Sequence, residues 1–429
     1  MMLLIKNGHV IDPANNIDAI QDIYITDGKI AALGGPPPAG FTPTQVIEAT
    51  GLVVCPGIVD LCTRLREPGH EHKGNIKTET TAAARSGITT LCCPPDTNPV
   101  IDTPAVIEHI QARTQAIGKA KVVVLGALTQ GLQSQQLSEM HALKNAGCVG
   151  VSNTSHAVNS NIMRRAMEYA ASANLTVFIN ASDPALSAGG CAHEGVVSVR
   201  LGLPGIPETA ETIAVARELQ LIQLTGARSH FCHLSSARAV QMVARAQYDG
   251  LPITANVTAH HLFLTEMDIG YFNSQCNVRP PLRTQRDMES LRTGLRQGTI
   301  SAICSDHQPH DIDAKLAPFP SSEPGISALE SLLPLTLRLV DNGCLTLSQA
   351  IDKLTHQPAT ILGLNAGRLT VGNAADICIF NPDEYWEYAQ EQLTSFGKNS
   401  PFIGWEFKGA VTHTLLDGKL VYQSSQTAH

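Results

Sequence analysis

Residues 227–259, ARSHFCHLSSARAVQMVARAQYDGLPITANVTA, contain a complete strand–helix–strand unit. Its two ends, 227–235 and 251–259, are short and largely apolar, and turn residues separate the second one from the helix, which favours buried strands. Between them, residues 236–250 place apolar side chains at the three- and four-residue spacing of a helix. Two buried strands joined by a helix lie parallel in one sheet, so this stretch predicts a parallel α/β fold.

The same unit recurs on both sides of this stretch. Eight strand–helix units on continuously apolar strands predict a (β/α)8 barrel, the TIM-barrel architecture, and we place it at residues 53–364. The helical pattern at 327–343 follows the eighth strand. The other predicted strands are 54–65, 87–94, 120–128, 147–153, 175–181 and 299–306, and the other predicted helices include 79–87, 160–174 and 209–226.

The two ends of the chain, residues 1–52 and 365–429, consist of short strands and turns. Asn-Gly and Asp-Gly pairs between apolar alternations are strong hairpin signals, and they predict turns at Asn7-Gly8, Asp27-Gly28 and Asp417-Gly418. Neither end makes a sheet large enough to be stable alone. We therefore expect the two ends to combine into one small β-sandwich beside the barrel.

Composition restricts the class of protein. The 429 residues are 43% hydrophobic, which provides a large core and excludes disorder. Thirty basic against thirty-eight acidic residues give a net charge of −8, which argues against nucleic-acid binding. No apolar run approaches the ~20 residues of a membrane span, and the first residues do not form a signal peptide. Eleven cysteines without a C-x-x-C pair indicate reduced, buried thiols, so we expect a cytoplasmic protein without membrane attachment.

Functional residues of such a barrel lie where its strands end, at the C-terminal face. The sequence after the first strand is DLCTRLREPG (60–69), and the sequence after the eighth is SDHQPH (305–310). The candidate site residues at these and the other strand ends are Cys62, Arg64, Arg66, Asp96, Asn153, Asn180, His233, Arg279, Asp306 and His310.

These motifs resemble the dihydroorotase branch of the cyclic amidohydrolases along essentially the whole chain. The resemblance implies a metal-dependent barrel with a small β-sandwich, which opens or closes the ring of dihydroorotate at a zinc site. It is carried by LREPG (65–69), TNPV (97–100), MRRAMEYA (163–170), GLPGIPETAE (202–211), HFCHLS (230–235), PPLR (280–283), SDHQPH (305–310), EPGISALESLLPL (323–335), GRLTVGNAADICIF (367–380) and KNSPFIGWEFKG (398–409).

The metal positions of that family are where this chain departs from the resemblance. The family's His-x-His at the end of the first strand falls on Cys62 and Arg64. Its bridging Asp falls on Asn153 and its His after the fifth strand on Asn180. The two remaining positions, which match, are His233 and Asp306, so four of the six are replaced.

Arg64 is the most consequential of these replacements. Side chains two apart on a strand share a face, so Arg64 faces the barrel mouth together with Cys62. A guanidinium held ~5 Å from a divalent ion repels it by several kcal/mol at an effective dielectric of ~20. We therefore expect no metal and predict that Arg64 takes the cation's place and pairs with Asp306. The alternative keeps one zinc ion on Cys62, His233 and Asp306, since three ligands and a water form a legitimate catalytic set.

The substrate contacts that the resemblance implies are only half retained. Arg66 and His310 match the family's substrate-binding Arg and His. Asp96 and Arg279 stand where the family has Asn, and the charge of Asp96 repels an anionic substrate. The pocket is thus either a weak anion site or a filled relic.

Within the family, the chain most resembles the inactive dihydroorotase-like chains that accompany the aspartate carbamoyltransferase catalytic chain. That resemblance implies a noncatalytic subunit in de novo pyrimidine biosynthesis, with this catalytic chain as its partner and with self-association in a mixed oligomer. The alternative is an active dihydroorotase, or a related hydantoinase- or allantoinase-like enzyme, with a rebuilt mononuclear zinc site. A third possibility is a small-molecule sensor that uses the old pocket.

Overall fold

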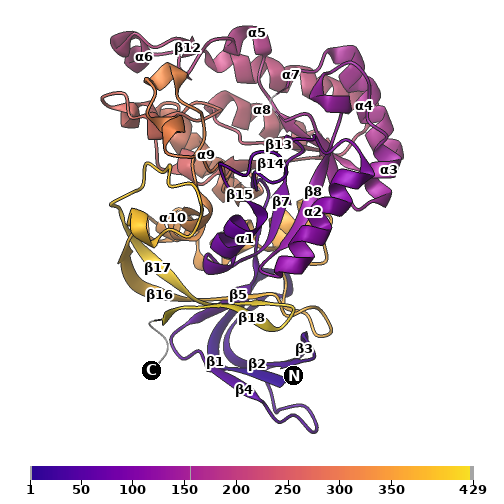
Figure 1. Cartoon of the computed structure of the whole chain (residues 1–429), viewed down its shortest axis with the longest axis vertical. Coiled ribbons are helices and arrows are strands. Elements are labelled where there is room, and N and C mark those ends of the chain that lie inside the picture. Colours follow the sequence, from indigo (N-terminus) through magenta and orange to yellow (C-terminus); the bar gives the residue numbers. More distant parts are fainter. Residues whose placement is uncertain (1, 155, 426–429) are drawn as a thin grey trace.

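The computed structural model describes residues 2–154 and 156–425, and eight parallel strands form its central sheet (Figure 1). In sheet order they run from β15 to β6, and each lies within one of the eight predicted strands, which confirms the predicted barrel. The strands are β6 (Ile58–Asp60), β7 (Ile88–Cys93), β8 (Lys121–Ala127), β9 (Gly150–Ser152), β10 (Thr176–Asn180), β13 (Ser229–Cys232), β14 (Ile253–Thr258) and β15 (Ala302–Cys304).

The barrel closes between β15 and β6 just beyond the strands themselves. The backbone N–H of Ser305 donates to Asp60 Oδ1 at 2.7 Å, and Thr63 and His307 form a parallel β-bridge. The residues directly after the first and eighth strands are therefore held side by side at the mouth.

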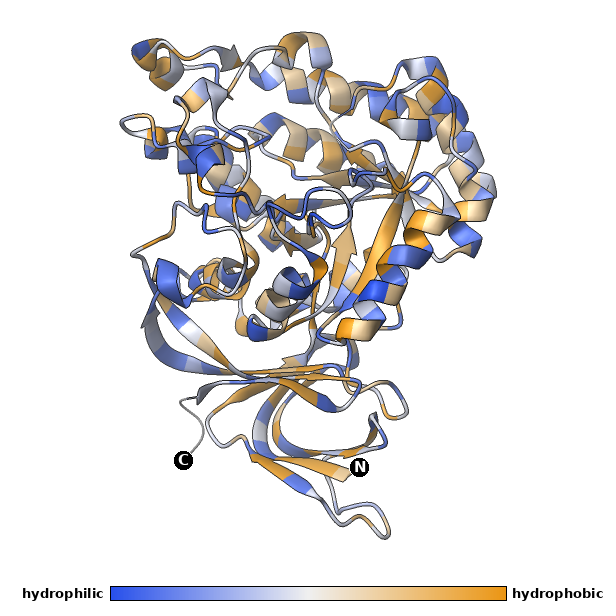
Figure 2. Ribbon diagram, in the orientation of Figure 1, coloured by the Kyte–Doolittle hydropathy of each residue, from blue (hydrophilic) through white to orange (hydrophobic). Residues whose placement is uncertain are grey.

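Helices surround the barrel and bury their apolar faces against it, and Figure 2 shows the hydrophobic strands that they enclose. Helix α8 illustrates the cause, since Ser236 caps its first turn by accepting from the Ala239 N–H and Val240 and Val243 are buried. No helix of the described residues is both long and apolar enough to cross a bilayer. The helices are α1 (Ile76–Arg85), α2 (Pro104–Ile117), α3 (Met140–Asn145), α4 (Ser160–Ser172), α5 (Pro184–Ser187), α6 (Val196–Leu201), α7 (Glu208–Thr225), α8 (Ala237–Tyr248), α9 (Gln285–Gln297), α10 (Leu329–Asp341), α11 (Leu347–Leu354) and α12 (His356–Ile361).

The two ends of the chain share a second, mostly antiparallel sheet of eight strands, which we call the terminal sheet. It has a core of its own that includes Leu3, Ile5, Ile377 and Leu415, and this confirms that the ends combine beside the barrel. The hairpins at Asp27-Gly28 and Asp417-Gly418 are present. Its strands are β1 (Met2–Asp12), β2 (Ile17–Thr26), β3 (Lys29–Leu33), β4 (Gln45–Glu48), β5 (Val53–Pro56), β16 (Ile377–Glu387), β17 (Glu406–Leu416) and β18 (Lys419–Gln423).

Two local predictions were wrong. The strand predicted over 54–65 is divided, because β5 pairs with β1 and β16 of the terminal sheet and only β6 enters the barrel. Asn7-Gly8 is not a turn but a bulge inside β1, where the register with β2 shifts. A Cβ on Gly8 would lie 2.5 Å from Val54 Cγ2, so this glycine allows a close approach between strands.

A fully buried ion pair joins α1 to the loop after β15. Glu79 Oε2 lies 2.8 Å from His307 Nε2 and accepts from Ser395 Oγ at 2.6 Å, while Oε1 accepts from the Phe396 N–H at 3.1 Å. Burial opposes the charge of Glu79, but the hydrogen bond and charge of His307 hold its pKa below the ordinary value. This carboxylate therefore connects the barrel to the segment that leads into β17.

We expect Glu79→Ala to lower the free energy of unfolding by about 3 kcal/mol at neutral pH, because it leaves several buried donors without an acceptor. The pKa of Glu79 is lowered in the folded state, so its contribution is complete above the ordinary pKa and is lost as the pH falls. Urea unfolding at several pH values measures both effects. The exposed Glu108 on α2 provides the control, and Glu108→Ala should change stability by less than about 0.5 kcal/mol.

Candidate functional site at the barrel mouth

Arg64 lies between two carboxylates at the mouth of the barrel. Its Nη1 lies 3.0 Å from Asp306 Oδ1, and its Nε donates to Asp96 Oδ2 at 2.8 Å. The Arg64 side chain is only 13% exposed, and its backbone N–H donates to the carbonyl of His307. The predicted pair between Arg64 and Asp306 is confirmed, and Asp96 is a second partner that was not predicted.

The charges of this cluster reinforce one another. Burial opposes the charge on Arg64, but the carboxylates of Asp96 and Asp306 raise the pKa of Arg64 above its ordinary value. Burial also opposes the charge on Asp96, and the neighbouring Arg64 nevertheless holds the pKa of Asp96 below its ordinary value. Arg64 and Asp96 are therefore both charged at neutral pH.

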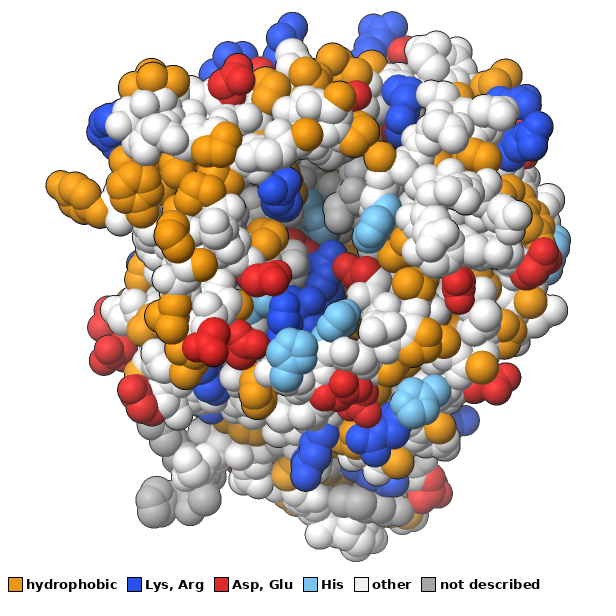
Figure 3. Space-filling model, turned by 45° about the horizontal axis from the view of Figure 1, so that its top comes forward, with side chains coloured by type: hydrophobic (Ala, Val, Ile, Leu, Met, Phe, Trp, Pro, Cys, Tyr) orange, Lys and Arg blue, Asp and Glu red, His pale blue; other side chains and the backbone are white. Residues whose placement is uncertain are grey.

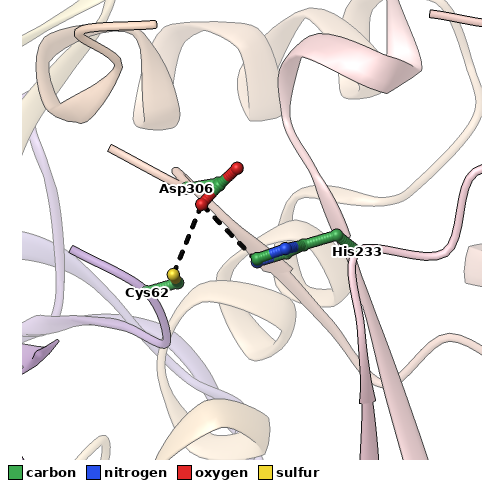
Figure 4. Close-up of side chains that lie close together, drawn as sticks. All are labelled: Cys62, His233 and Asp306. Carbon is green, nitrogen blue, oxygen red and sulfur yellow. Dashed lines mark hydrogen bonds and ion pairs between the residues drawn. The ribbon is translucent and has the colours of Figure 1, made fainter. Parts of the chain in front are cut away.

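Cys62, His233 and Asp306 point toward one another, as Figure 4 shows. The Cys62 thiol donates to Asp306 Oδ1 at 3.4 Å, and His233 Nε2 lies 3.9 Å from the same oxygen. One ligand atom from each residue lies within 4.8 Å of the others, so their spacing alone could hold a metal ion. Neither ring nitrogen of His233 has a hydrogen-bond partner in the described part of the chain.

Zinc does not fit this group while Arg64 keeps its position. Arg64 Nη1 lies 3.0 Å from Asp306 Oδ1 and 3.9 Å from Cys62 Sγ, the two atoms that would bind the ion. A zinc ion ~2 Å from that oxygen would lie within ~5 Å of the guanidinium. The resulting repulsion amounts to several kcal/mol at an effective dielectric of ~20. Burial and Asp306 also raise the pKa of the Cys62 thiol well above its ordinary value, which opposes the thiolate that zinc requires.

Asn153, at the position of the family's bridging carboxylate, has a structural role. Its Oδ1 accepts from Thr129 Oγ1 at 2.8 Å and from the Thr129 N–H at 3.2 Å. Its Nδ2 donates to Ser134 Oγ and to the carbonyl of His156, both at 3.2 Å. The amide therefore joins the loops after β8 and β9 through donors and acceptors that one carboxylate could not satisfy. Asn180 ends β10, half-buried, opposite Cys232 in the register with β13.

The residues that the resemblance assigns to substrate mostly bind the protein itself. Arg66 Nε donates to the carbonyl of Pro309 at 3.0 Å, and its Nη2 lies 3.2 Å from His310 Nε2. Burial and Arg64 lower the pKa of Arg66 to about 10. Arg279 Nη2 donates to the carbonyl of Gly190 at 2.8 Å. Arg66 and His310 thus meet, whereas Arg279 bonds to the backbone of a different loop.

One small cavity lies beside Arg64. Figure 3 shows a hollow at the mouth in which basic, acidic and histidine side chains gather. Arg64, Arg66 and Asp96 help to line a cavity of about 10 Å³. Such a volume is at the lower limit for one water molecule, whereas pockets for small molecules measure hundreds of Å³.

The backbone of the mouth nevertheless keeps an uncommon conformation. Arg66, His233 and Asp306 have φ values of 64°, 55° and 47°, in the left-handed region that L-residues rarely adopt. Such strain concentrates at functional sites, where the surrounding structure maintains it. The mouth is therefore shaped like a functional site although its side chains neutralise one another.

Two contacts of this cluster were not predicted from the sequence. We interpreted Asp96 as a group that repels substrate, whereas it is the nearest carboxylate to Arg64. Gln308 Nε2 donates to Asp306 Oδ2 at 2.9 Å and occupies the second oxygen of that carboxylate. Opposite charges at the ends of the adjacent strands β6 and β7 were the available signal for the first contact.

The architecture is an amidohydrolase-type fold. It matches the structure of L-hydantoinase from Arthrobacter aurescens with a TM-score of 0.88, at 24% identity, over 98% of this chain and 96% of that chain. A structure of D-hydantoinase matches with a TM-score of 0.83 at 21% identity, over 99% and 96% of the two chains. At this level of identity, both matches establish the fold.

Sequence comparison is more specific. The family model described as dihydro-orotase-like matches residues 51–239, and that of the amidohydrolase family matches residues 330–422. A dihydroorotase-like protein from Pseudomonas aeruginosa is 49% identical over 99% of this chain and 100% of its own length. A dihydroorotase from Geobacter metallireducens is 42% identical over the same shares. This chain belongs to the dihydroorotase-like amidohydrolase family.

Proposed function

We propose that this chain is a catalytically inactive, dihydroorotase-like subunit that supports the assembly and activity of aspartate carbamoyltransferase in de novo pyrimidine biosynthesis. The observation that carries the proposal is the position of Arg64, whose guanidinium bonds to both Asp96 and Asp306. The cationic centre of the mouth is then an amino-acid side chain, which cannot activate water as a Lewis acid does.

The other polar groups of the mouth do not replace that function. A general base must be free to accept a proton from water. Asp306 already accepts from Arg64, the Cys62 thiol and Gln308, and Asp96 is paired with Arg64. The ring nitrogens of His233 have no partner among the described residues, but burial lowers the pKa of His233 and so makes it a weaker base. Hydrolysis of a ring amide would therefore depend on a weak base without the help of a Lewis acid.

A structural role is consistent with the rest of the molecule. The barrel core and the terminal sheet are complete and continuous, so the chain presents a large, specific surface without a competent mouth. Relatives named dihydroorotase-like protein in Pseudomonas aeruginosa and Pseudomonas putida are 49% and 47% identical, against 42% for the Geobacter metallireducens dihydroorotase. The higher identity to the two dihydroorotase-like proteins favours that branch of the family.

The second candidate is an active cyclic amidohydrolase with one zinc ion on Cys62, His233 and Asp306. The spacing of these ligand atoms and the unpartnered ring of His233 favour it. It requires Arg64 to leave both of its carboxylate partners, which makes it the weaker proposal.

We expect this chain to co-elute with the aspartate carbamoyltransferase catalytic chain of the same organism as one large complex that contains several copies of each. Transcarbamoylase activity should be at least about tenfold higher in the complex than for the catalytic chain alone, if assembly orders its active site. Size-exclusion chromatography with light scattering and an activity assay measure both. A catalytic chain that elutes separately and is fully active alone would contradict the proposal.

A further inference from the structure

A group of exposed apolar side chains lies on the rim of the barrel mouth. Seven of the seventeen large hydrophobic residues that are exposed in the described chain belong to it. Figure 3 shows hydrophobic side chains gathered beside the hollow, at the upper left. We call this group the rim patch, and it consists of Val196, Val199, Met267, Tyr271, Phe272, Ile312 and Leu316.

Three segments that are distant in sequence form the rim patch. They are α6, the 3-10 turns η4 (Glu266–Ile269) and η5 (Ser274–Cys276), and the turn η6 (Asp313–Lys315). Figure 1 shows α6 at the end of the barrel that is far from the terminal sheet.

Close contacts hold these segments together. Ser274 Oγ donates to the carbonyl of Lys315 at 2.6 Å, and the buried Lys315 ammonium donates back to the carbonyl of Ser274 at 3.2 Å. A Cβ on Gly195, just before α6, would lie 3.1 Å from Glu266 Oε2. The apolar side chains therefore project from one continuous and supported surface.

Tyr271 and Phe272 are the most prominent members. The Tyr271 side chain is fully exposed, at 101% of its reference area, and Phe272 has a φ of 63°. A bulky residue in the left-handed region costs free energy and persists where the surrounding structure imposes it. The base of the loop is fixed, because Ile269 and Cys276 are buried and the Asn273 N–H donates to the carbonyl of Ile269 at 2.8 Å. The fold thus holds two aromatic rings in solvent, and such rings are enriched among the anchors of protein interfaces.

The charges around the rim patch indicate what covers it. The exposed charged residues on these segments or within three residues of them are Glu194, Asp268 and Asp313, against the basic Arg200 and Arg279. A second copy packed face to face would therefore place an excess of acidic groups in the interface, which is unfavourable. Complementarity instead favours a different chain, with an apolar pocket flanked by lysine or arginine.

We infer that the rim patch is the docking surface for the partner subunit of the proposed complex, with Tyr271 inserted into an apolar, basic-flanked pocket of that subunit. This inference rests on the proposed function and adds to it the place of contact. The barrel mouth then lies against the partner, so the hollow around Arg64 is closed by the assembly.

The test compares three variants for binding to the aspartate carbamoyltransferase catalytic chain of the same organism. Tyr271→Asp and Leu316→Asp should each weaken the complex about thirtyfold or more, as expected for an interface anchor. Tyr248→Asp is the matched control, since Tyr248 on α8 is 83% exposed and lies outside the rim patch, and it should bind like the wild type. Circular dichroism and thermal unfolding check that the variants fold alike.

The outcomes separate this inference from the proposed function. If the wild type and all three variants bind equally, the complex exists and the rim patch is not its docking surface. If the wild type itself does not bind, the proposed function fails and the surface assignment fails with it. If Tyr271→Asp instead reduces the mass of the protein alone in light scattering, the occupant is a second copy and the inference is overturned.

Discussion

Arg64→Met should lower the free energy of unfolding by about 3 kcal/mol at neutral pH, at the lower end of the range for breaking a buried ion pair. The loss is large because the substitution leaves two carboxylates, Asp96 and Asp306, without their shared cation. We take the lower end because Asp96 is 23% exposed, and water compensates part of its charge. Urea unfolding of the wild type and the variant measures the difference.

The pH dependence identifies the cause. In the wild type the pKa of Asp96 is lowered, so its contribution to stability is complete above the ordinary pKa and is lost as the pH falls. Without Arg64, burial is the largest remaining influence on Asp96 and acts to raise its pKa. Protonation of Asp96 then removes a buried, unpaired charge and reduces the loss of stability in the variant. The difference between the two proteins should therefore shrink toward about pH 4.

Two further variants act as controls. Arg64→Lys keeps the charge but loses the planar guanidinium that bonds to Asp96 and Asp306 at the same time. Its stability should therefore lie between those of the wild type and Arg64→Met. Adding Asp96→Asn to Arg64→Met removes one of the stranded charges and should restore part of the stability. A loss that is the same at every pH would show that Arg64 acts through packing alone.

The fold was predictable because its signals are local. Each barrel strand is a short apolar run bounded by turn residues, and each such run appears in the structure. The errors lie where a contact with a segment that is distant in sequence determines the local structure. Asn7-Gly8 has the sequence of a turn, but Val54 packs against Gly8 and keeps β1 continuous. Residues 53–56 are as apolar as a barrel strand, but β1 and β16 draw them into the terminal sheet.

The site was predictable in part for the same reason. The two-residue period of a strand predicts Cys62 and Arg64 on one face. Both lie just beyond β6, on either side of Thr63, whose β-bridge to His307 brings them to Asp306. The contact with Asp96 depends on which way a long, flexible side chain turns, and the period of the strand does not specify that. The rim patch was not predicted either, since exposure of an apolar residue depends on the packing of distant segments.

The chemistry of the mouth therefore depends on which cation neutralises Asp306, a metal ion or the guanidinium of Arg64. A metal ion and a guanidinium both neutralise Asp306, but only the metal ion can activate water. Arg64 already satisfies Asp306 and Asp96, so a metal ion would have to displace it from two bonds as well as approach its charge. The same residue that stabilises the mouth thereby opposes the metal, which links the stability prediction to the metal prediction.

The wild type should accordingly contain less than about 0.1 equivalent of zinc after purification without chelator, and it should not hydrolyse dihydroorotate. The double variant Cys62→His with Arg64→His should bind about one equivalent, at least about a hundredfold more tightly, because two imidazoles join His233 and Asp306 and the repelling charge is gone.

Cys62→His alone is the matched control. It supplies a better ligand but keeps Arg64, and it should bind as little zinc as the wild type. Elemental analysis measures the metal, and thermal unfolding with and without zinc shows whether it binds the folded chain. A full equivalent of zinc in the wild type, together with turnover of dihydroorotate, would overturn the inactive-subunit proposal. Zinc in Cys62→His alone would show that the ligand at position 62, and not the charge of Arg64, excludes the metal.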